Sequence, residues 1–92
     1  MTIAKPSVRY LRREPREDEV LLATWVIFER PRDYPNGFVV RRQVAARCGG
    51  IWVDPIAVGV ATLEQARAEV PVGSTNMGRF DGDDPAIKET WI

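Results

Sequence analysis

The chain has 92 residues, no histidine, one cysteine and a formal net charge of zero. This length gives one domain with a modest core, and the longest apolar run falls far short of the ~20 residues of a membrane helix. Without histidine the commonest general base is missing, and a lone cysteine excludes a structural zinc site and an intramolecular disulfide. We therefore expect a soluble, cytoplasmic, non-enzymatic protein without cofactor or metal, and no contact with membranes.

Charge is distributed unevenly along the chain. Residues 1–50 hold ten Lys/Arg and six Asp/Glu, a net charge of +4, whereas residues 51–92 hold three and seven, a net charge of −4. Such a dipole can steer association with a partner or with a second copy. The alternative is that the two halves fold against each other and their charges largely cancel.

The first 19 residues are rich in charge and contain two prolines. Proline and charge are typical of edge strands, because both discourage unwanted pairing. We predict that residues 1–19 form a charged arm or an edge strand, and that residues 20–92 form a single α+β domain.

Residues 20–30 and 38–47 predict the two strands of a hairpin, joined by Tyr34-Pro35-Asn36-Gly37. Asn-Gly is a strong turn signal between β-branched and aromatic runs. Both faces of residues 20–28 are apolar, so this strand needs a neighbour on each side and cover on each face. The expected second neighbour is the C-terminal strand or residues 7–12.

The rest of the chain predicts one helix and two further strands. Residues 56–60 and 86–92 are typical of strands, whereas Ile51-Trp52-Val53 is apolar but short. Thr62 and Gln65 form a capping box, so residues 62–70 are predicted to be helical. The predicted fold class is α+β: a small, mainly antiparallel sheet in the order strand-strand-strand-helix-strand, with one short helix packed on one face.

A nine-residue helix is ~13 Å long and covers only part of a four-stranded sheet. The remaining cover must come from the 72–84 loop with Met77 and Phe80, from the arm, or from another molecule. Monomers rarely leave large apolar patches exposed, so we expect a second copy of the chain to cover the open sheet face in a symmetric homodimer.

Three short patterns could carry chemistry, and each has a simpler interpretation. Asp81-Gly82-Asp83-Asp84 could bind a cation, but Asp and Gly are typical of turns. The glycines of residues 73–78 follow a helix, whereas a phosphate-binding loop follows a strand. Cys48 has no base to activate it, and free cysteines commonly act as small hydrophobes.

Tryptophan and arginine dominate the energetically important residues of protein interfaces. We expect Trp25 to lie in the core and Trp52, between Gly50 and Pro55, to be partly exposed. The candidate interface residues are Trp25, Arg41, Arg42, Trp52 and Trp91.

These observations favour a protein–protein interaction module that can associate with itself. Two alternatives are weighed against it. The first alternative is a nucleic-acid-binding protein that uses the basic N-terminal half, although the isoelectric point of about 6.2 argues against it. The second is a small enzyme or ligand carrier that uses the 72–84 loop.

Overall fold

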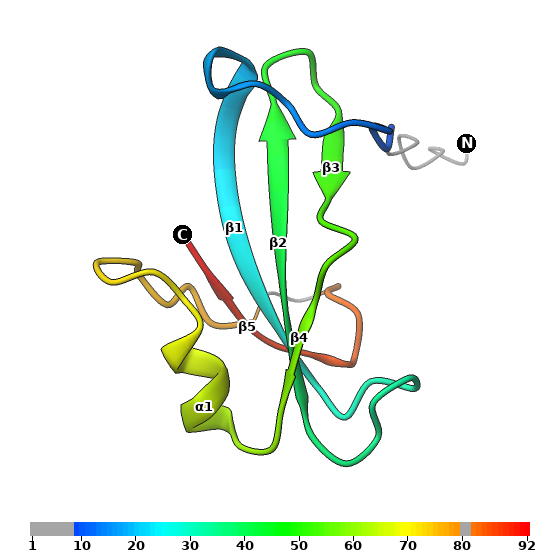
Figure 1. Ribbon diagram of the computed structural model, residues 1–92, viewed down its shortest axis with the longest axis vertical. Helices are drawn as coiled ribbons and strands as arrows, with labels where there is room; N and C mark the ends of the chain where they lie inside the picture. The colour runs from blue at the N-terminus through cyan, green and yellow to red at the C-terminus, as the bar shows by residue number, and fades with distance from the viewer. Residues whose placement is uncertain (1–8, 80–81) are drawn as a thin grey trace, which may run out of the picture.

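A long antiparallel hairpin forms the centre of the computed structural model, which describes residues 9–79 and 82–92 (Figure 1). Strand β1 spans Val20–Glu29 and strand β2 spans Phe38–Ala46. Their register is regular apart from an irregularity near the start of β1. The predicted hairpin is confirmed.

The other strands attach to the two outer edges of this hairpin. On the β1 side lies β5, Ile87–Trp91, so the expected pairing of the C-terminal strand with β1 is confirmed. On the β2 side lie both β3, Ile51–Val53, and β4, Val58–Val60. All these pairings are antiparallel, and with one short helix they confirm the predicted α+β class.

Strand β3 was not predicted, because three residues are too few for a recognisable strand pattern. It forms on the exposed edge of β2, opposite Gln43–Ala45. One further hydrogen bond, from the backbone N–H of Asp54 to the carbonyl of Arg42 at 3.0 Å, extends this pairing. The strand therefore forms because β2 offers an edge to pair with, and not because of a pattern in its own sequence.

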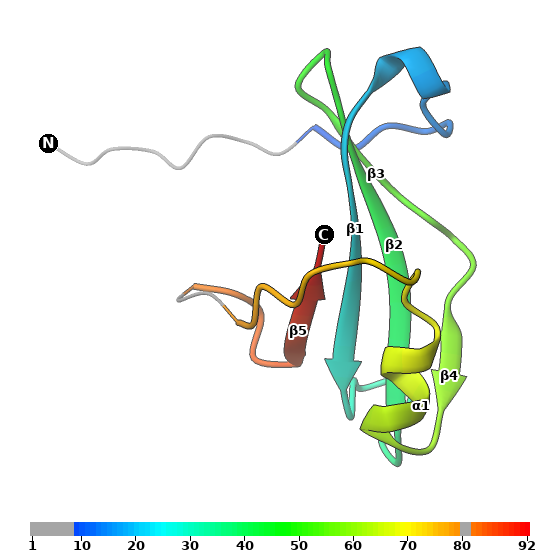
Figure 2. The same ribbon diagram turned by 90° about the vertical axis from the view of Figure 1, so that its left-hand side faces the viewer.

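Helix α1, Leu63–Ala68, is fixed at its start by the predicted capping box. The hydroxyl of Thr62 accepts from the backbone N–H of Gln65 at 3.1 Å, and the Gln65 side chain accepts from the N–H of Thr62 at 3.1 Å. Ala66 and Val70 are buried against the sheet. Figure 2 shows the helix on one side of the β1–β2 hairpin, which we call the helix face of the sheet.

The described part of the arm joins the free edge of β3 instead of β1. The backbone N–H of Leu11 donates to the carbonyl of Ile51 at 2.8 Å, and the N–H of Ile51 donates to Arg9 at 2.9 Å. The Leu11 side chain then packs on Gly50, where an added Cβ would lie 2.6 Å from Leu11 Cδ2. The alternative that residues 7–12 pair with β1 is thus wrong for residues 9–11.

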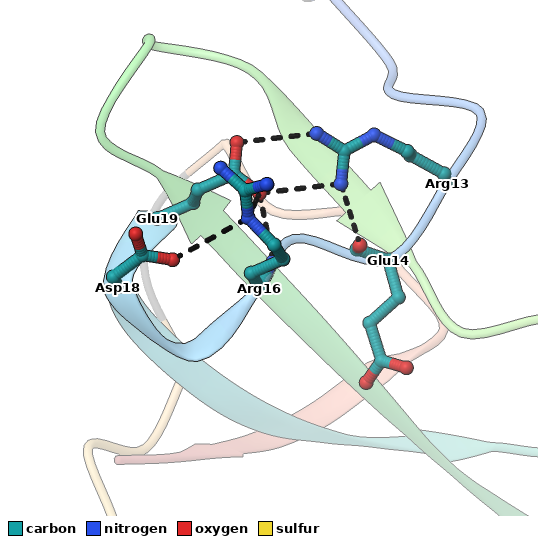
Figure 3. A network of polar contacts seen from close by, with 5 residues as sticks. All are labelled: Arg13, Glu14, Arg16, Asp18 and Glu19. Atoms are coloured by element: carbon teal, nitrogen blue, oxygen red, sulfur yellow. Dashed lines mark hydrogen bonds and ion pairs between the residues drawn. The ribbon is translucent and has the colours of Figure 1, made fainter.

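Ion pairs hold the turn between the arm and β1 (Figure 3). Both terminal nitrogens of Arg13 donate to the Glu19 carboxylate at 3.2 Å. The backbone N–H of Arg16 donates to the same carboxylate at 2.9 Å. This N–H and the Arg13 guanidinium lower the pKa of Glu19 below its ordinary value.

Part of the 72–84 loop extends the sheet. Thr75 and Ile92 exchange backbone hydrogen bonds of 2.8 and 2.9 Å, and Met77 donates to Thr90 at 2.8 Å. Met77, one of the residues that could cover the open sheet face, is itself 43% exposed. Phe80, the other residue expected to provide cover, lies outside the described residues.

Replacing Gly50 with alanine should test whether the arm is docked. We expect Gly50→Ala to lower the free energy of unfolding by about 1–2 kcal/mol, because the new methyl group overlaps the Leu11 side chain. In a Leu11→Ala background the same change should have little further effect. Chemical denaturation of the four variants measures this coupling, and equal effects of Gly50→Ala in both backgrounds would contradict it.

Candidate protein-binding groove

The sheet register brings three of the predicted interface residues into one row across three strands. Trp91 on β5 lies opposite Trp25 on β1, and Trp25 lies opposite Arg42 on β2. Trp25 and Trp91 pack against the core cluster that includes Ile27. The row therefore lies on the helix face of the sheet, and the two tryptophans are only half-buried.

Arg42 is held in place by neighbours on both sides. Its Nη1 donates to Glu14 Oε1 at 2.8 Å, and its guanidinium carbon lies 5.7 Å from the centre of the Trp52 ring. The Trp52 side chain is buried, so the expectation that it is partly exposed is wrong. The arm supplies the reason, because Glu14 holds the Arg42 guanidinium over the indole.

Arg41 lies on the opposite face of the sheet, since side chains alternate along β2. Its Nη1 donates to the backbone carbonyl of Asp54 at 2.7 Å, so it ties the chain between β3 and β4 to β2. Arg41 therefore does not share a surface with the other four candidate interface residues.

A hollow of about 200 Å³ lies beside Trp25 and Arg42 on the helix face. Its rim includes Ile56, which is 77% exposed, and Val58, which is 38% exposed. We call this hollow and its rim the Trp25 groove.

Two carboxylates give the groove an acidic border. Asp54 Oδ1 accepts from the backbone N–H of Ile56 at 2.8 Å, which fixes the turn that projects the Ile56 side chain. Glu69 is the C-cap residue of α1, and its carboxylate makes no hydrogen bond or ion pair with the residues that the structure describes. A carboxylate at this end of a helix faces the negative end of the helix dipole. The helix therefore does not stabilise the charge of Glu69.

Sequence reasoning identified Trp25 and Arg42 but missed Ile56, Val58 and Glu69. Ile56 and Val58 belong to a run that is typical of a buried strand. They are exposed because the chain leaves the β2 edge between β3 and β4. Glu69 lies within the predicted helix 62–70, and nothing in the sequence singles it out. No local signal in the sequence brings these three residues together.

A second polar contact anchors α1 to β5 beside the groove. The guanidinium of Arg67 donates through Nε and Nη2 to the two carboxylate oxygens of Glu89, with Nε–Oε1 at 3.0 Å. Trp91 Nε1 donates to the same carboxylate at 3.2 Å. Glu89 is 6% exposed, and its pKa is lowered mainly by the Arg67 hydrogen bonds, which outweigh the opposing effect of burial.

The remaining sequence patterns lie in turns and loops of the described residues 9–79 and 82–92. Cys48 is exposed in the turn between β2 and β3. Asp84 accepts from the backbone N–H of Ala86 at 2.9 Å, as in the turn interpretation, while Asp81 lies outside the described residues. Across the described residues, no group of three or more Asp, Glu or Cys side chains could hold a metal ion.

No protein-family model, curated protein or solved structure matches the chain. Among the residues described, no helix is long and apolar enough to cross a membrane.

The Glu89 carboxylate should make a stability contribution that depends on pH. Because its folded pKa lies below the ordinary value of 4.5, the contribution is present above that pH and is lost as the pH falls through the folded pKa. We expect Glu89→Gln to reduce the free energy of unfolding by about 1–2 kcal/mol at pH 7 and much less near pH 3.

Urea denaturation at both pH values measures this difference. Glu17→Gln is the matched control, since Glu17 is exposed in the short 3-10 turn before β1. An effect of Glu89→Gln that is the same at both pH values would contradict the assignment.

Proposed function

We propose that the protein is a non-enzymatic protein-binding module and that its partner docks at the Trp25 groove. The observation that carries this proposal is the exposure of Ile56 and Val58 beside the half-buried Trp25. A partner that places an apolar side chain in the hollow would bury all three. Such centrally placed aromatic and apolar contacts supply most of the energy of protein interfaces.

The charges around the groove favour a partner with a basic residue next to its apolar anchor. Arg42 is neutralised by Glu14, whereas Glu69 has no partner among the described residues. A lysine or arginine of the partner would therefore meet Glu69 without facing a free cation of this chain. Complementary charge of this kind sets orientation and specificity more than affinity.

The arrangement of the arginines gives no support to nucleic-acid binding. Arg41 and Arg42 point to opposite faces of the sheet, and Arg13, Arg16 and Arg42 are engaged in ion pairs. A phosphate backbone needs cations gathered on one surface.

Site-specific photo-crosslinking in the native host tests where the partner docks. A benzophenone amino acid at position 56 should capture the partner, whereas the same group at position 72, where Val72 is fully exposed, should not. Ile56→Asp should weaken binding of the captured partner by at least about tenfold, and Val72→Asp should leave it unchanged. Equal capture at both positions would contradict the docking site.

Two further measurements define the partner. Glu69→Lys should weaken its binding, whereas Glu64→Lys, a matched change on the exposed side of the same helix, should not. Sedimentation equilibrium at tens of micromolar decides whether the partner is a second copy. A mass twice the 10.4 kDa of the chain that returns to 10.4 kDa in Ile56→Asp would identify self-association, and 10.4 kDa throughout would exclude a second copy as the partner.

A further inference from the structure

A second hollow, of about 630 Å³, lies at the end of the sheet where β1 leads into the loop before β2. Arg30, Pro31 and Arg32 line one side, and residues 84–86, which lead into β5, line the other. Figure 1 shows both segments at the lower end of the β1–β2 hairpin. The volume is in the range of small-molecule binding sites.

The backbone at Arg30 is in a conformation that favours glycine. Its φ is +48°, and it is the one non-glycine residue with positive φ among those described. Its backbone N–H donates to the carbonyl of Gly37 at 2.8 Å, so the hairpin itself holds the residue there. Glycine would meet this requirement without steric strain, and the arginine side chain is therefore unexplained by the local fold.

The carboxylates in the hollow have partners within the chain, whereas the arginines do not. Glu29 Oε2 lies 3.7 Å from Lys88 Nζ, and Asp84 Oδ1 accepts from the backbone N–H of Ala86 at 2.9 Å. Arg30 and Arg32 make no hydrogen bond or ion pair with any described residue. The lining side chains carry two cations, Arg30 and Arg32, and two carboxylates, Glu29 and Asp84. Only the carboxylates have partners, so the two exposed guanidinium groups are left open to an anion.

We propose that this hollow binds a phosphate monoester, with Arg30 and Arg32 holding the phosphate. Guanidinium groups donate paired, charge-assisted hydrogen bonds to phosphate oxygens. A dianionic phosphate matches two guanidinium charges, whereas a carboxylate matches one. Phe28, Pro31 and Pro85 supply apolar surface for the organic part of the ligand. This site is separate from the Trp25 groove and does not depend on it.

Isothermal titration calorimetry with phenyl phosphate, inorganic phosphate and benzoate tests the proposal. We expect phenyl phosphate to bind at least about tenfold more tightly than benzoate or inorganic phosphate, because it alone offers both the dianion and the ring. Arg32→Gln should weaken its binding by at least about tenfold. Arg47→Gln, an exposed arginine beyond the far end of β2, is the control of equal charge and should change nothing.

The strain at Arg30 gives a second, independent readout. Arg30→Gly should raise the melting temperature, because it relieves the positive φ, and should weaken phenyl phosphate binding by at least about tenfold. Opposite effects on stability and binding are not expected for a residue that serves only the fold. A lower melting temperature, binding that is unchanged in Arg30→Gly or Arg32→Gln, or no binding of phenyl phosphate to the unmodified chain would overturn the proposal.

Discussion

The pairing of both edges of β2 is the constraint on which the rest of the structure depends. One edge is occupied by β1 along nearly its whole length, and the other is shared by β4 near its start and β3 near its end. The backbone of the described arm pairs with β3 near Tyr10, and α1 begins shortly after β4. Since these elements are too short to be stable alone, the position of each is set by the strand it pairs with or follows.

The division of one β2 edge between two short strands also creates the Trp25 groove. Between β3 and β4 the chain leaves the sheet, and the Asp54 carboxylate fixes the turn that projects Ile56 outward. On β2 this gap exposes Arg42, which the arm then neutralises through Glu14. The groove is thus bordered by β2, the β3–β4 connection and the end of α1, and a partner there would contact all three.

The sequence predicted the strands and the helix that depend on local patterns of residues. The hairpin followed from two apolar runs, and the helix from Thr62 and Gln65, three residues apart in a capping box. The sequence could not predict contacts between residues that lie far apart in the chain, because no local pattern links them. The Arg67–Glu89 pair joins residues 22 positions apart, and the burial of Trp52 depends on Glu14 holding Arg42 over it. The Asn36-Gly37 signal marked the right place in the chain, but residues 30–37 form a longer loop whose positive φ falls on Arg30 rather than on Asn36 or Gly37. Gly37 instead admits the Tyr34 ring, 2.5 Å from where its Cβ would be.

Two residues occupy places that the local backbone does not favour, and each lines a different hollow. Arg30 has a positive φ that suits glycine, and Glu69 puts a negative charge at the carboxyl end of a helix. In a small domain with little stability to spare, residues of this kind are expected where binding has overridden local preference. Neither side chain is compensated by a contact with the described residues. Both side chains are exposed, so water solvates their charges in the free protein. Under the two proposals an anion at Arg30 and a cation at Glu69 would replace that water, and the two hollows would take ligands of opposite charge.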